Sequence, residues 1–176
     1  MEALTSSVED VEWIHVEEES AVGQVRRAAV ALAERLDLSD RRRAEIAIAA
    51  TELATNLRLH AVAGTMLLRV RRCGDAAAVE VIAVDAGPGI ANLTLAMRDG
   101  ESDAGTLGIG LGAVARLASY FDTHTLVGRG TVMIATFWET GTSFAPPRVA
   151  MVTRPFHGEA NCGDASAYRF DGGATT

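Results

Sequence analysis

The sequence predicts an α+β fold, a two-layer α/β sandwich in which helices cover one face of a mostly antiparallel mixed sheet. Two observations lead to this prediction. The expected elements follow the order strand, helix, helix, strand, strand, helix, strand, strand, and both long helical segments carry a single apolar stripe. Because each stripe must be buried, the helices are expected to pack on the sheet.

Two consecutive segments are expected to be long helices. The first runs from a cap at Ser20 to about Leu36, and its apolar residues recur at steps of three and four. The second begins at the cap Ser39, runs to about His60 and is expected to end through Gly64. Its core stripe is Ile46, Ala50, Leu53 and Leu57, whereas Glu45, Glu52, Asn56 and His60 lie on another face.

The remaining elements are expected to be mainly strands. The expected strands cover residues 11–16, 66–72, 79–84, 121–127 and 131–138, and a further helix covers 111–119. Residues 91–107 are expected to form a short helix and a flexible loop. Residues 139–176 contain three of the four prolines and predict a linker and a short stub after a domain of residues 1–138.

Composition excludes several classes of protein. The net charge of -7 disfavours nucleic acid and anionic membranes as partners. The first ten residues do not resemble a signal peptide, and no apolar run reaches transmembrane length. The two cysteines, Cys73 and Cys162, have neither metal-ligand spacing nor a disulfide framework. We therefore expect a cytoplasmic protein.

Glu52 and Asn56 stand four residues apart in an alanine-rich helical stretch, so they share a face about 40° apart around the axis. A glutamate can accept a proton, and an asparagine oxygen can bind Mg²⁺ together with phosphates. An exposed pair on a solvated helix face is the commoner arrangement. Two glycine-bearing segments further along the chain favour a functional site.

The first of these segments is Asp85-Ala86-Gly87-Pro88-Gly89, which follows an expected strand. Its carboxylate can accept a hydrogen bond from an exocyclic amine, and its glycines let the backbone approach a flat ring. A tight turn capped by Asp85 explains the same residues equally well.

The second segment, residues 105–112, opens a helix with four glycines. Free N–H groups at such a helix start favour phosphate, whereas a glycine hinge would carry an entropic cost without a structural gain. A Walker P-loop is excluded because the chain contains no lysine. A Rossmann fingerprint is disfavoured because the spacing is G-x-G-x-G and no parallel βαβ unit is expected.

Together these residues resemble the GHKL (Bergerat-fold) ATPase superfamily. Glu52 and Asn56 match its N box, Asp85, Gly87 and Gly89 its first glycine box, and residues 105–112 its second, while Gly130-Thr131 matches a short element of the last strands. The resemblance covers about residues 10–138. Within the superfamily, Glu-Leu-Ala-x-Asn and the second glycine box look like the RsbT-type branch of anti-sigma-factor and switch-protein serine kinases.

The resemblance implies a site for ATP and Mg²⁺. Glu52 would be the catalytic base or would orient a serine hydroxyl, and Asn56 would hold Mg²⁺ bound to ATP. Asp85 would accept from the adenine amine near Thr131, with Gly87 and Gly89 against the base. The phosphates would lie against Gly105, Thr106, Gly108, Gly110, Leu111 and Gly112, under a lid formed by residues 91–107. Without lysine, an arginine would have to contact the phosphates, and Arg98 is the nearest in sequence.

The resemblance also implies a protein partner. That partner would be a STAS-domain (anti-anti-sigma or stressosome) protein or a sigma factor, and the chain would phosphorylate or regulate it. The alternative is a non-catalytic ATP-sensing module that controls a sigma factor or an attached PP2C-type phosphatase. An exposed N-terminal strand edge would permit a homodimer.

Two further expectations concern residues outside this site. Asn161 to Ala165 look like the opening of SpoIIE-like PP2C phosphatases, but Asp164 and Asp171 cannot form a two-metal site, so no phosphatase activity is expected. The arginines at positions 41–43 and at 69, 71 and 72 are expected on solvated faces.

Overall fold

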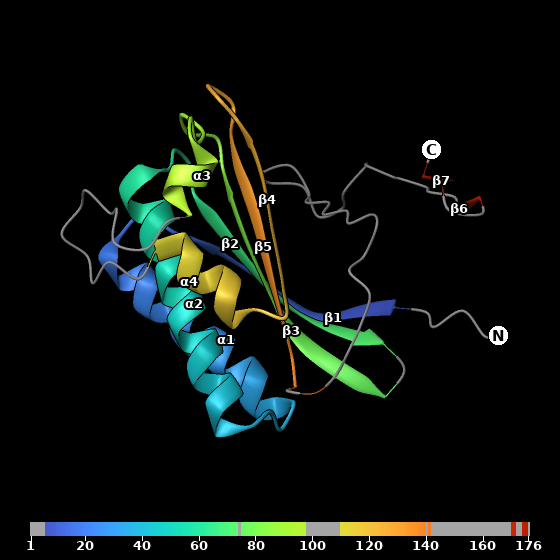
Figure 1. The fold of residues 1–176 in the computed structure, drawn as a ribbon. Helices are drawn as coiled ribbons and strands as arrows, with labels where there is room; N and C mark the ends of the chain where they lie inside the picture. Colours follow the sequence, from blue (N-terminus) through green and yellow to red (C-terminus); the bar gives the residue numbers. More distant parts are fainter. Residues whose placement is uncertain are drawn as a thin grey trace, which may run out of the picture. The chain divides into compact units, whose positions relative to one another are not determined.

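The computed structural model describes residues 6–73, 75–97, 110–139, 141, 170–171 and 174–175. Its main part is a sheet with helices packed on one face, the predicted two-layer α+β sandwich (Figure 1). The helices are α1 (Glu19–Arg35), α2 (Asp40–His60), α3 (Leu93–Ala96) and α4 (Gly110–Leu117). The strands of this sheet are β1 (Ser6–His15), β2 (Thr65–Cys73), β3 (Ala76–Asp85), β4 (Tyr120–Leu126) and β5 (Gly130–Trp138).

The sheet has the strand order β1-β2-β3-β5-β4, and each pairing between neighbours is antiparallel. The chain leaves the sheet after β3, passes through α3 and α4, and returns through β4 to place β5 beside β3. In this register Asp85 lies opposite Thr131. The two segments that end and begin at these residues therefore meet at one end of the sheet.

The core lies between the helices and the sheet, and alternate residues of the strands point into it. Val79, Val81 and Ala83 of β3 belong to it, and so do Met133, Ala135 and Phe137 of β5. The same alternation puts Asp85 and Thr131 on the helix-facing side. The predicted α2 stripe is confirmed, since Ile46, Ala50, Leu53 and Leu57 are all buried.

The boundaries of the helices differ in part from the predictions. Ser39 caps α2 as predicted, because its side chain accepts from the Arg42 N–H. Ser20, however, lies inside the first turn of α1, whose N-cap is Glu18 and has no side-chain cap hydrogen bond. Helix α2 ends at His60, and Gly64 instead leads into β2. A Cβ on Gly64 would lie 3.1 Å from the Leu57 Cβ, so this glycine lets the connection pack against α2.

The expectation that the arginines lie on solvated faces is wrong for several of them. Arg42 is 8% exposed. Arg69 and Arg71 have side chains only 11% and 15% exposed, and both pair with Glu80, whose side chain is 1% exposed. Tertiary contacts decide these cases, because arginine can be buried when its charge is paired and hydrogen-bonded.

The strand β1 lies at an edge of the sheet, and it begins earlier than predicted because a bulge between Glu9 and Glu12 lets it continue. The edge position is the one that a homodimer through β1 would require, and the oligomeric state stays a prediction. No helix in the described ranges is long and apolar enough to cross a membrane.

The chain divides into two compact units, Met1–Thr142 and Ser143–Thr176. In the second unit β6 (Phe170–Asp171) pairs antiparallel with β7 (Ala174–Thr175). The residues that resemble a phosphatase opening, 161–165, lie outside the described residues, and Asp171 lies in β6.

Candidate functional site

The turn after β3 forms one side of the candidate site. The Gly87 N–H donates to Asp85 Oδ1 over 2.7 Å, so Asp85 does cap the turn, as the structural explanation required. A carboxylate has about four acceptor positions, and one bond leaves capacity for an exocyclic amine. Asp85 is half-buried at the end of its strand. Both explanations of this segment are therefore compatible with its geometry.

The two glycines of this turn are required by close backbone contacts. A Cβ on Gly87 would lie 2.8 Å from Asp85 Oδ1 and 3.1 Å from the His60 carbonyl oxygen. Gly89 has φ of +72°, and a Cβ there would lie 2.4 Å from the Leu126 carbonyl oxygen. The turn is thus pressed against the end of α2 on one side and against the β4–β5 hairpin on the other.

Thr131 lies opposite Asp85, and a second threonine, Thr125, lies beside Thr131; only Thr131 was predicted. Thr131 is 4% exposed, and its Oγ1 lies 3.1 Å from Thr125 Oγ1. Thr125 Oγ1 also accepts from the Ile90 N–H over 2.7 Å, which holds the end of the first glycine segment to β4. Thr125 was not predicted from the sequence. A signal was present, because the hairpin over residues 128–130 pairs Thr125 with Thr131.

Glu52 and Asn56 stand on α2 and lead along it to this turn. Both are half-buried, and neither side chain has a hydrogen-bond partner among the described residues. His60 follows one turn after Asn56, and the Ala86 N–H donates to the Val62 carbonyl over 3.0 Å just beyond the helix end. Eight residues of helix span about 12 Å, so Glu52, Asn56 and the Asp85 turn lie in sequence along one path.

His60 itself is exposed in the last turn of α2. A cationic side chain there interacts favourably with the helix dipole. Its carbonyl oxygen is the atom that a Cβ on Gly87 would approach.

The helix α4 supplies the described part of the second glycine segment. It begins at Gly110, one residue before the predicted start, and Leu111 and Gly112 are buried in its first turn. Gly110 has φ of +60°, a conformation that favours glycine. Gly105, Thr106, Gly108 and the candidate phosphate contact Arg98 lie outside the described residues.

The predicted lid is described only as far as residue 97. Its short helix α3 is capped by Asn92, whose Oδ1 accepts from the Leu95 N–H over 3.0 Å.

The described residues alone do not form a complete metal site. Within the described ranges, no group of three or more His, Cys, Asp or Glu side chains could hold a metal ion. The half-buried Asn56 can contribute one oxygen, which suits Mg²⁺ carried mainly by phosphates and water. The residues present therefore fit an ion that arrives with a nucleotide.

Most of the main sheet and its two long helices fall in a region that matches a known protein family. Residues 15–137 match the histidine kinase-like ATPase domain. The chain belongs to this family. The match includes all five strands of the main sheet, at least in part, and both long helices, and it contains every described candidate residue.

Two relatives extend the comparison. The chain is 37% identical over 95 residues to the serine/threonine-protein kinase RsbT of Bacillus subtilis. The aligned region covers 54% of this chain and 71% of the relative. A solved structure of the RsbU and RsbW domains of a Mycobacterium tuberculosis protein matches with a TM-score of 0.52 at 17% identity. That match covers 78% of this chain and 35% of the solved chain, and it supports the fold alone.

Proposed function

We propose that this chain is an ATP-dependent protein-serine/threonine kinase of bacterial sigma-factor signalling, acting in the cytoplasm on a STAS-type partner or a sigma factor. The observation that carries the proposal is the convergence of α2 with the Asp85 turn. Glu52 and Asn56 approach along α2, and Asp85 and Thr131 face the same side at the end of the sheet. The 37% identity to a serine/threonine-protein kinase supports the same reaction class.

In this proposal the end of the sheet recognises adenine. Asp85 accepts a hydrogen bond from the adenine amine, and the Thr131 hydroxyl lies on the same side of the sheet. Gly87 and Gly89 let the backbone approach the ring closely. The Gly87 bond to Oδ1 fixes the orientation of the carboxylate before the nucleotide arrives.

The phosphates would lie between α2 and the start of α4. Gly110, Leu111 and Gly112 would present N–H groups of the first turn of α4, continuing the segment that includes Gly105, Thr106 and Gly108. Asn56 would hold Mg²⁺, which neutralises charge on the phosphate oxygens when it is bound.

Glu52 would act one turn before Asn56. It would accept the proton of the partner's serine hydroxyl as the serine oxygen bonds to the γ-phosphorus, and ADP would leave with the electrons of the broken bond. A half-buried carboxylate without a hydrogen-bond partner among the described residues remains available for this proton.

The domain division is also a proposal. Residues 1–138 would be the ATP-binding domain, and 139–176 a linker with a truncated phosphatase-like stub. The chain divides into two compact units between residues 142 and 143, which supports a domain boundary close to residue 138.

Calorimetric titration of ATP with and without Mg²⁺ tests the nucleotide site. We expect Mg²⁺-dependent binding to the wild type and its loss in Asn56→Ala, whereas the exposed neighbour Arg58→Ala should bind as the wild type does. Absence of binding to the wild type would refute the proposal.

Phosphoryl transfer separates a kinase from a module that senses ATP without turnover. The assay is radiolabelled ATP with purified STAS-domain proteins. We expect phosphoserine with the wild type, and Glu52→Gln should bind ATP but transfer little. Binding without transfer to any STAS candidate would replace the kinase by the ATP-sensing module.

A further inference from the structure

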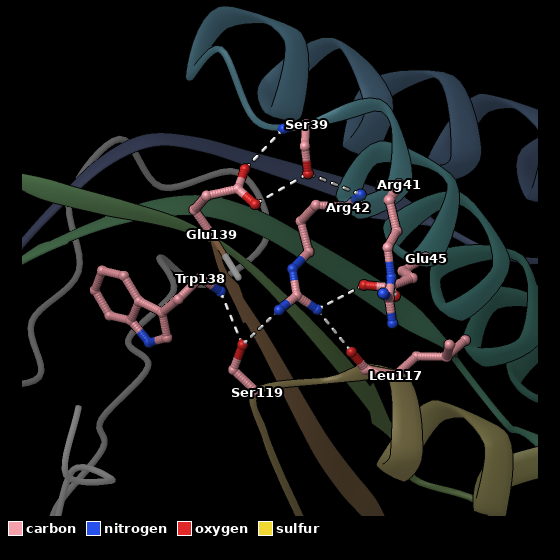
Figure 2. A network of polar contacts seen from close by, with 8 residues as sticks. All are labelled: Ser39, Arg41, Arg42, Glu45, Leu117, Ser119, Trp138 and Glu139. Atoms are coloured by element: carbon pink, nitrogen blue, oxygen red, sulfur yellow. Dashed lines mark hydrogen bonds and ion pairs between the residues drawn. The ribbon is translucent and has the colours of Figure 1, made fainter. Parts of the chain in front are cut away.

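Arg42 joins the beginning of α2 to the end of α4. Its Nη1 donates to the Leu117 carbonyl oxygen over 2.9 Å and to Glu45 Oε2 over 2.7 Å. Its Nη2 donates to Ser119 Oγ over 3.4 Å, and the Trp138 N–H donates to the same oxygen over 3.1 Å. Figure 2 shows the guanidinium between α2, the α4–β4 connection and the end of β5.

The contact with Leu117 closes the C-terminus of α4. The last four carbonyl groups of a helix have no partner within it, and they carry the negative end of its dipole. A guanidinium that reaches one of them from another helix provides both a hydrogen bond and a favourable charge. This bond is largely shielded from water, because Arg42 is 8% exposed.

The first turn of α2, which carries Arg42, is also held in place by hydrogen bonds. Glu139, at the end of β5, accepts from the Ser39 N–H over 2.7 Å and from the Ser39 hydroxyl over 2.9 Å. Figure 2 shows this pair beside Arg42. The carboxylate lies at the N-terminus of α2, where the dipole favours a negative charge. The turn from which Arg42 projects is therefore attached to the sheet.

We propose that Arg42 is a positioning residue for the phosphate part of the nucleotide site, and this inference rests on the function proposed above. Arg42 holds the C-terminal end of α4 to α2. The opposite end of α4 begins with Gly110, and its buried residues Leu111 and Val114 pack into the same core as α2. Arg42 thereby sets where the phosphate-binding turn lies relative to Glu52 and Asn56.

A small tilt of α4 would displace the phosphate-binding turn appreciably. Helix α4 spans about 10 Å from Leu117 to Gly110, and Glu52 lies about 15 Å along α2 from Arg42. A tilt of about 6° at the held end moves Gly110 by about 1 Å. Misplacement of this size at a reacting group can reduce a rate by about a hundredfold.

The test compares Arg42→Met with Arg43→Met in the full chain. Methionine retains much of the apolar stem and removes the guanidinium. Arg43 is the next residue of α2, and its ion pairs, with Asp37 and Asp40, do not reach α4. Thermal unfolding first establishes that both variants are folded. Ser119→Ala, which removes one acceptor of Arg42, serves if Arg42→Met does not fold.

The first measurement is amide hydrogen exchange of residues 110–117 in the absence of nucleotide. We expect exchange in α4 to accelerate at least about tenfold in Arg42→Met and to remain unchanged in Arg43→Met. Arg42→Lys should be intermediate, because an ammonium lacks the planar fork that reaches Glu45, Leu117 and Ser119 together.

The second measurement compares ATP with AMP as ligands. Arg42→Met should weaken ATP binding about tenfold and AMP binding less than twofold, since AMP lacks the outer phosphates. An unchanged ratio of the two affinities, or unchanged exchange of α4, would overturn the inference. If the wild type binds neither nucleotide, the proposed function fails, and the exchange of α4 alone then decides whether Arg42 holds this helix.

Discussion

Replacing Gly130 by alanine should damage both the fold and the nucleotide site. Gly130 is the first residue of β5 and is buried. It has φ of +114°, and a Cβ there would lie 2.0 Å from the carbonyl oxygen of Asp85. The strand end that carries Asp85 would have to move away.

The size of the effect follows from these contacts. Ordinary van der Waals contact begins at 3.4 Å, so β3 and β5 must separate locally by more than about 1 Å. Backbone strain at such a φ costs about 2 kcal/mol, and loss of a sheet hydrogen bond adds about 1 kcal/mol. Gly130→Ala should therefore lose about 3 kcal/mol of unfolding free energy. Displacement of Asp85 should weaken ATP binding about tenfold or more.

The same hairpin offers a matched control. Gly128 has φ of +76°, but a Cβ there would meet no atom within 4 Å. Gly128→Ala should therefore pay only conformational strain, about 1 kcal/mol, and should bind ATP like the wild type. Urea denaturation measures the stability of each variant, and calorimetric titration measures its ATP affinity. Equal losses in the two variants would refute the reasoning, because the contact with Asp85 would then contribute nothing.

Three further results are expected. Arg69→Met should cost about 3 kcal/mol in urea denaturation, because it leaves the buried Glu80 carboxylate poorly paired, and adding Glu80→Met should recover much of the loss; a fully additive double variant would contradict this. Burial, with help from a neighbouring carboxylate, raises the pKa of Tyr120 above 10.0. Its contribution to stability is thus present below pH 10 and is lost as the pH rises through the folded pKa, and Tyr120→Phe should remove this part of the alkaline pH dependence of unfolding. Glu139→Gln should reduce the free energy of unfolding by about 0.5 kcal/mol and so lower the melting temperature slightly. Added salt should abolish this difference if the carboxylate acts on the dipole of α2.

Much of the main layer could be predicted from local patterns. The apolar stripe of α2 fell on the residues that are buried, and Ser39 capped the helix as its position predicted. These features depend on neighbours within one or two turns, and the sequence displays such neighbours directly. The functional roles of Glu52, Asn56 and Asp85 stay predictions that the binding experiments test.

The errors have a common physical cause. Serine is a residue type that often caps helices, but the N-cap of α1 is Glu18 and not Ser20. Gly64 packs against Leu57 and does not end α2. Arginine is a residue type usually found on the surface, but Arg42 and Arg69 are both buried against partners distant in sequence. A local pattern does not contain these partners.

Periodicity, glycine spacing and the order of elements determined the fold class and the family resemblance by themselves, because each is written into short stretches of chain. Only the tertiary structure decided that Thr125 lies beside Thr131, that the turn at Gly87 rests on the end of α2, and that Arg42 closes α4. Each of these contacts joins segments that meet only when the sheet has formed and the helices have packed on it. Their energies depend on distances of a few tenths of an ångström between such segments, which no periodicity in the sequence specifies.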